Sequence, residues 1–145
     1  MNIVDTSVLV ELLDVPGYNS KHDDLLTEFT VRQRRGDEFL VPLAVLFETG
    51  NHIAHGSDGV VRRTAAKQFV DFTRRSLAGK SPFVPTPFPE VRDVAAWLDA
   101  FPDQAARGIG LVDHSLIGLW EVQRAILKNR AVVIWSLDQH LAAYG

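Results

Sequence analysis

Two acidic residues follow short apolar runs, at the points where buried strands are expected to end. Asp5 comes after Ile3 and Val4, and Asp138 comes shortly after the apolar run 132–135. β-branched and aromatic residues favour strands, and a carboxylate entering an apolar interior must be paired or bound to something. We therefore place both acids at strand-to-helix corners, where ligands bind in open parallel sheets. If the two strands are neighbours, both carboxylates lie at the same edge of the sheet.

Two further acids fall on predicted helices. Asp113 begins the apolar face of a helix predicted over 112–127, and Glu48 lies at the edge of the apolar face of a helix predicted over 43–55. Glu48 is rotated by roughly 140° from Leu43 at about 100° per residue. Taken alone, Asp113 is explained equally well as a helix-capping residue, and Glu48 is explained better as a solvated helix residue.

The four acids carry a chemical argument only as a set. Several carboxylates in one cleft repel one another unless a cation joins them. The chain has no Cys, and oxygen ligands without thiolates suit Mg²⁺ or Mn²⁺. Such ions polarise phosphoryl oxygens and activate water. The set therefore indicates hydrolysis of a phosphodiester.

The elements that position these acids can be predicted from hydrophobic periodicity and from Pro and Gly breakers. In chain order we expect strand 2–5, helices 7–13 and 21–35, strand 39–41, helices 43–55 and 60–78, an edge strand or extended segment in 83–89, helices 90–100 and 112–127, strand 131–135 and a short terminal helix. This order predicts a three-layer α/β/α sandwich with a mostly parallel central sheet, formed by one domain over residues 1–145.

Three of these helices carry apolar stripes that we expect to face inward. The stripes consist of Leu43, Leu46, Phe47, Gly50, Ile53 and Ala54; of Ala65, Phe69 and Phe72; and of Val91, Val94, Ala95 and Leu98. Residues 101–110 contain Pro and Gly and are predicted to form a loop.

Bulk composition excludes some classes of protein. No apolar run is long enough to span a bilayer, and no basic segment precedes an apolar one at the start of the chain. We expect a cytoplasmic protein that makes no membrane contact. The net charge of −3 and the pI near 5.9 argue against a protein that coats nucleic acid, although they leave room for local basic patches.

Four segments resemble the motifs of PIN-domain ribonucleases, and in particular the VapC-type toxins of VapBC toxin–antitoxin pairs. They are Asp5-Thr6-Ser7, Glu48 in the helix after the second strand, Gly-Leu-Val-Asp113-His-Ser-Leu-Ile, and Ser136-Leu-Asp138-Gln-His-Leu. The resemblance implies Asp5, Glu48, Asp113 and Asp138 as catalytic residues and ligands of Mg²⁺ or Mn²⁺, with Thr6 and Ser136 as supporting hydroxyls. It also implies metal-dependent endoribonuclease activity on RNA, a cognate antitoxin protein and a homodimer. His114 and Trp135 depart from the pattern, because small residues are common there, and they put substrate preference in doubt.

Basic residues gather in two clusters between positions 32 and 80. The first contains Arg32, Arg34 and Arg35, and the second contains Arg63, Lys67 and Arg74. Either cluster would suit an RNA backbone, but an ordinary solvated helix face explains them equally well.

The histidines and tryptophans are interpreted mostly as structural or exposed residues. His52 and His55 have a possible ligand spacing, but neither Cys nor an acidic motif surrounds them, so we do not expect zinc. His114 and His140 each lie close to a candidate acid. Contact with a phosphate is one interpretation of either residue, but we expect both to be exposed residues near the site. The three tryptophans fit core or interface positions better than base-stacking positions.

Two other functions compete with the nuclease. A haloacid-dehalogenase-like phosphatase also has an acid after its first strand, but its motif requires a second Asp where this chain has Ser7. A PIN-like binding module without activity is the second alternative, and the presence of all four acids argues against it.

Overall fold

A computed structural model describes residues 1–56 and 58–145 of the chain. Its centre is a parallel sheet with strand order β3-β2-β1-β4. The strands are β1 (Asn2–Val4), β2 (Phe39–Val41), β3 (Phe83–Pro85) and β4 (Val133–Trp135). Val4 is paired with Trp135 and Val41 with Pro85, so the carboxyl ends of the strands form one edge of the sheet. The predicted edge strand in 83–89 is confirmed as β3.

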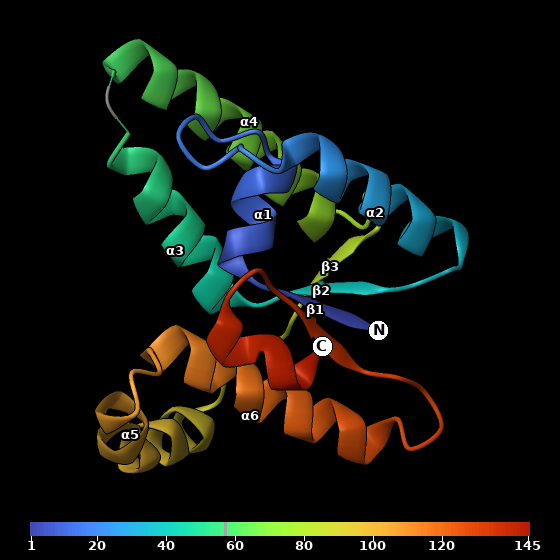
Figure 1. The fold of residues 1–145 in the computed structure, drawn as a ribbon, viewed down its shortest axis with the longest axis vertical. Helices are drawn as coiled ribbons and strands as arrows, with labels where there is room; N and C mark the ends of the chain where they lie inside the picture. Colours follow the sequence, from blue (N-terminus) through green and yellow to red (C-terminus); the bar gives the residue numbers. More distant parts are fainter. Residues whose placement is uncertain (57) are drawn as a thin grey trace.

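Helices cover both faces of this sheet (Figure 1). One layer contains α1 (Thr6–Leu12), α2 (His22–Arg34), α3 (Leu43–Ala54) and α4 (Gly59–Leu77), and the other contains α5 (Val91–Ala106), α6 (Leu111–Ile126) and the 3₁₀ helix η1 (Gln139–Tyr144). The predicted three-layer α/β/α sandwich is confirmed. The chain moves outward from β1 to β2 and β3 and then returns to the other side of β1 as β4. The gap between β1 and β4 is therefore the topological switch point, where open parallel sheets bind ligands.

The strands form because their residues can be buried on both faces. Ile3, Val4 and Phe39 have no exposed surface, and Ile134 is 2% exposed. Near-continuous apolar runs of this kind are typical of parallel strands covered by helices on both sides. Phe83 packs against the rings of Phe29, Phe39 and Phe72, which ties the edge strand to the main core.

The predicted inward face of α3 is partly wrong. The structure buries Val45, Thr49 and Ile53, whereas Phe47 is 66% exposed. The helix packs between α1 and α4, and contact with both neighbours sets a stripe with a spacing of four residues. Glu48 directly precedes Thr49 in this stripe and is partly buried. This agrees with its predicted position at the edge of the apolar face.

The prediction for α5 is wrong in two respects. The helix continues through Pro102 to Ala106, where a loop was expected. Val91, Val94 and Leu98 are exposed by 87%, 37% and 52%, although they were predicted to face inward. A Pro costs less on an exposed turn, where water can reach the carbonyl that it leaves unpaired. The inward side instead carries Trp97, which packs against α6.

Among residues 1–56 and 58–145, no helix combines the length and the apolar character needed to cross a membrane.

Candidate active site

Asp5 lies immediately after β1 and is held by four hydrogen bonds. Its side chain is the N-cap of α1: Oδ1 accepts the Thr6 backbone N–H at 2.7 Å, and Oδ2 accepts the Ser7 backbone N–H at 3.3 Å. Oδ2 also accepts the Ser7 hydroxyl at 2.6 Å and the Ser136 hydroxyl at 2.7 Å. Because the residue is only 4% exposed, these donors offset the cost of burying a carboxylate.

The end of β4 meets Asp5 across the switch point. The Asp5 backbone N–H donates to the Trp135 carbonyl at 3.0 Å, which sets Ser136 beside Asp5. Ser136 Oγ in turn accepts the Asp138 backbone N–H at 2.8 Å. The Asp138 side chain caps η1 by accepting the His140 N–H at 2.8 Å. Asp5 and Asp138 therefore lie at equivalent corners of neighbouring strands, as the sequence predicted.

Glu48 approaches the same edge from α3. The Thr6 hydroxyl donates to Glu48 Oε2 at 2.6 Å. This bond joins the first turn of α1 to the first half of α3. The Glu48 carboxylate is thus held by Thr6, the residue that follows Asp5. Thr6 and Ser136, which the sequence singled out as supporting hydroxyls, thus contact one carboxylate each.

Asp113 completes the cluster from the first turn of α6. The pKa of Asp113 is raised to about 6, first by burial and then by the charges of Asp5, Asp138 and, less strongly, Glu48, while a hydrogen bond from the Gly110 backbone opposes the rise. A carboxylate whose pKa rises beside other acids lacks a compensating positive charge. Four acids from four separate segments therefore act on one another at this edge of the sheet.

Helix capping accounts for part of this arrangement. It explains Asp5 and Asp138, which both cap helices. Asp113 lies in the first turn of α6, where the backbone of the N-cap residue Gly110 hydrogen-bonds to its carboxylate. Its capping role and its interaction with the other acids are therefore both present, and the capping contact does not offset the rise in its pKa.

The ligand atoms of the cluster are of the type that a hard divalent cation prefers, but their spacing does not form a complete binding site. Carboxylate and hydroxyl oxygens are the ligands that Mg²⁺ and Mn²⁺ prefer, and the charges of neighbouring acids contribute to the raised pKa of Asp113. Yet within residues 1–56 and 58–145, no three His, Asp or Glu side chains are close enough to hold one metal ion.

Ser7 is a site residue that sequence reasoning missed. Its hydroxyl donates to Asp5, accepts the Leu137 backbone N–H at 2.9 Å and lies 3.4 Å from Ser136 Oγ. It therefore links the corner after β1 to the corner after β4. The sequence signal is a hydroxyl two residues after a strand-ending acid, within the Asp5-Thr6-Ser7 segment.

The first basic cluster lies away from the acids. Arg32 bonds to Asn2 and Glu28 and stacks over the ring of Trp135, 4.7 Å from its centroid. Asn2 starts β1, so this bond places the Arg32 guanidinium near the amino end of that strand. Arg35 pairs with Asp37 at 3.0 Å. These bonds favour a structural role for this cluster over an RNA rim.

The second basic cluster is exposed. Arg63, Lys67 and Arg74 lie on α4, which packs mainly against α3 and β3. Its role as an RNA rim stays a prediction.

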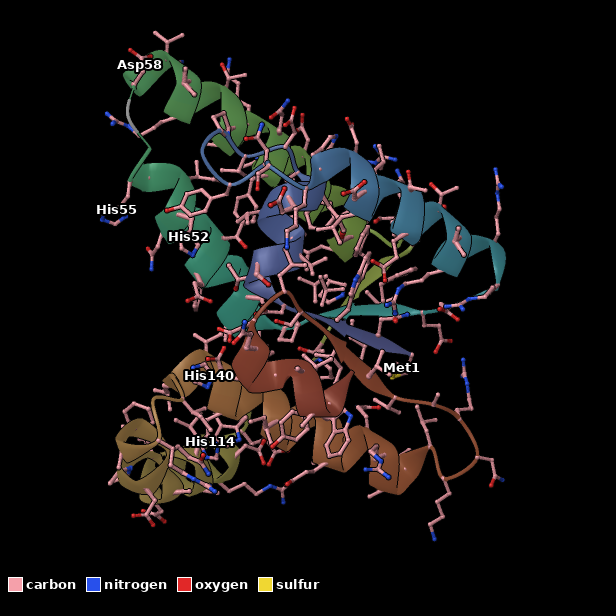
Figure 2. All side chains as sticks on the ribbon, in the orientation of Figure 1. Met1, His52, His55, Asp58, His114 and His140 are labelled. Carbon is pink, nitrogen blue, oxygen red and sulfur yellow. The ribbon has the colours of Figure 1, made fainter. Side chains whose placement is uncertain are left out.

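The histidines separate into two groups (Figure 2). His52 contacts the ring of Tyr18 at 4.6 Å, and His55 bonds to the carbonyl of Asn51 in its own helix, so neither is arranged as a zinc ligand. His140 is exposed, as expected. His114 was expected to be exposed too, but both of its ring nitrogens are shielded from solvent and lack a hydrogen-bond partner among the described residues.

Comparison with known proteins adds no family to this description: no family model, no curated protein and no solved structure matches the chain. Any functional assignment therefore depends on the residues and their geometry.

Proposed function

We propose that this chain is a metal-dependent endoribonuclease of the PIN-domain type. The observation that carries the proposal is the convergence of Asp5, Glu48, Asp113 and Asp138 at the switch point, expressed in the raised pKa of Asp113. Helix capping does not require four acids from four segments in one place. A site that binds a divalent cation beside a phosphate does use carboxylates gathered in this way.

In this proposal the four acids hold Mg²⁺ or Mn²⁺, with Asp5 and Asp113 as the main ligands and Glu48 and Asp138 beside them. The bound cation would neutralise charge at the phosphate and make water more nucleophilic. The hydroxyls of Thr6, Ser7 and Ser136 orient the carboxylates through the bonds described above. These contacts fix the orientation of the carboxylates.

The proposal extends to partners and to the cellular role. As a VapC-type toxin the chain would act on RNA in the cytoplasm and be neutralised by a cognate antitoxin protein. It would also form a homodimer. The exposed apolar side chains Val91 and Leu98 on α5 support an interface between protein chains on that side.

Cleavage of RNA by the purified protein tests the assignment directly. We expect wild type to cut single-stranded RNA when Mg²⁺ or Mn²⁺ is present and to stop when the metal is chelated. Asp5→Asn keeps the size of the side chain but removes a charge, and it should abolish cleavage. Asp103→Asn, a change at an exposed acid on α5, is the matched control and should cleave as wild type does. Equal cleavage by wild type and Asp5→Asn, or none with any metal, would contradict the proposal.

A PIN-like binding module without activity is the second candidate. It is favoured by the absence, in the described residues, of three acids close enough to hold one ion. The same assay separates the two functions, because a binding module would retain RNA or one protein partner without cutting RNA under any metal.

A further inference from the structure

A wide groove continues the carboxyl edge of the sheet beyond the acids. It has a volume of about 1270 Å³ and lies among the start of α3, the segment after β3, α5 and α6. The Thr6–Glu48 bond marks the β1 side of α3, and the groove opens on the β3 side of the same helix. The volume exceeds the range of about 300–1,000 Å³ that is typical of small-molecule pockets. The groove is therefore suited to part of a polymer.

Two exposed aromatic rings line this groove. Phe47 is 66% exposed and Phe88 is 74% exposed. Thr86 donates its backbone N–H to the Val41 carbonyl at 3.3 Å, which brings the segment carrying Phe88 next to the start of α3. Phe47 directly precedes Glu48, so their side chains diverge by about 100°. One turn of α3 thus presents an acid to the cluster and an aromatic ring to the groove.

The charges and polar groups of the groove indicate what it would hold. Three acids, Glu90, Asp93 and Glu121, line the groove with two bases, Arg92 and Arg107, and Arg92 pairs with Glu90 at 3.0 Å. The lining therefore carries no excess of positive charge, which suits a neutral aromatic group better than a phosphate. His114 lines the groove, and its two nitrogens have no partner among the described residues. These nitrogens are shielded from solvent as they stand, so they gain a partner only when the imidazole turns toward the groove. A polar ligand would then satisfy them, whereas an apolar protein face would not. The edge of a nucleobase offers both donors and acceptors once the imidazole turns toward it.

We propose that this groove binds unpaired bases of the RNA next to the cleaved phosphate. Phe47 and Phe88 are the stacking surfaces, and His114 contacts a base edge and helps to select the base. Single-stranded RNA is recognised mainly by such stacking and by hydrogen bonds to splayed bases. The inference rests on the proposed nuclease function for the meaning of the neighbouring phosphate, and it gives His114 a part in substrate preference.

Binding without cleavage tests the groove separately from the acids. The probe is a labelled single-stranded oligouridine, compared with an abasic oligomer of the same length, and the affinity is measured by anisotropy in EDTA. Phe47→Ala and Phe88→Ala should each weaken binding of oligouridine by between about fivefold and about 150-fold, the range expected for losing one stacked base. Neither change should weaken binding of the abasic oligomer. Both side chains are exposed, so the fold should survive, which circular dichroism checks.

Two variants sharpen the experiment. Val60→Ala alters a side chain that is 76% exposed on α4 and should bind both oligomers as wild type does. His114→Leu removes the ring nitrogens and should reduce the difference in affinity among the four homopolymers.

Each outcome decides a separate question. Unchanged oligouridine affinity in both Phe variants overturns the groove, even where Asp5→Asn abolishes cleavage. Base-dependent binding lost in these variants supports the groove, even where no metal produces cleavage and the nuclease proposal fails. If Phe47→Ala instead converts a dimer into a monomer and leaves RNA affinity unchanged, the face is a protein interface and the inference is wrong.

Discussion

Asp113→Asn is expected to stabilise the metal-free protein at neutral pH. The pKa of Asp113 is raised from 3.8 to about 6, first by burial and then by the charges of Asp5 and Asp138. At neutral pH the wild-type carboxylate is ionised against these unfavourable surroundings. The amide of Asn has nearly the same shape and can still accept a hydrogen bond from the Gly110 backbone, but it carries no charge. The substitution therefore removes repulsion without opening a cavity.

The magnitude follows from the raised pKa. The difference between 3.8 and about 6 corresponds to about 3 kcal/mol, at about 1.4 kcal/mol for each pKa unit. Asp113 is only partly buried, so solvent screening reduces this figure, and we expect about 1–2 kcal/mol. Because the folded protein binds the proton more tightly, the stabilising contribution is complete below pH 3.8 and is lost as the pH rises through about 6. The advantage of the variant should therefore appear across that window and stay constant above it.

Urea unfolding in EDTA measures this effect. Wild type and Asp113→Asn should have similar free energies of unfolding near pH 4 and should diverge by the stated amount at about pH 7.5. Asp103→Asn, at an exposed position on α5, should show no such divergence. Adding Mg²⁺ should stabilise wild type more than Asp113→Asn, because a ligand that binds only the folded state raises its stability. If Asp113→Asn is equally stable or less stable than wild type at about pH 7.5 in EDTA, the acids do not act on one another as described.

Two further substitutions test the contacts that hold the site together. Ser7→Ala removes a hydroxyl that bonds to Asp5 and to the Leu137 backbone. It should therefore lower the free energy of unfolding by about 1–2 kcal/mol and reduce RNA cleavage. Normal stability together with normal cleavage would show that the link between the two corners has no role. Gly118→Ala brings a methyl group to 2.9 Å from Trp97 Nε1. It should therefore destabilise the fold by about 1–3 kcal/mol and change the tryptophan fluorescence. An unshifted melting temperature would mean that α5 moves aside freely.

Local residue patterns were sufficient to predict the order of elements and the corners that carry the acids. Runs such as Ile3-Val4 and 132–135 are apolar on both sides, and only a parallel strand covered by two layers buries them fully. Asp5 and Asp138 break those runs, and the break marks the carboxyl ends of the strands. These features depend on neighbouring residues in the chain, so they are readable without the fold.

The orientation of the helices depended on contacts between distant segments. Periodicity predicted the wrong inward faces for α3 and α5, because Phe47 and Val91 are apolar and yet exposed. A helix turns toward the neighbours that enclose it, and for α3 these are α1 and α4, which no local pattern specifies. The same holds for Arg32, whose partners Asn2 and Trp135 lie far from it in the chain.

The candidate site divides in the same way. The residue types at positions 5, 48, 113 and 138 identified four acids, but each had a plausible explanation of its own. Only the pairing of β1 with β4 and the approach of α3 and α6 bring these carboxylates within range of one another. Electrostatic repulsion depends on distance in space, and distance in space is set by long-range packing. The bond from Ser7 to the chain after β4 likewise exists only once 130 residues of separation have been closed.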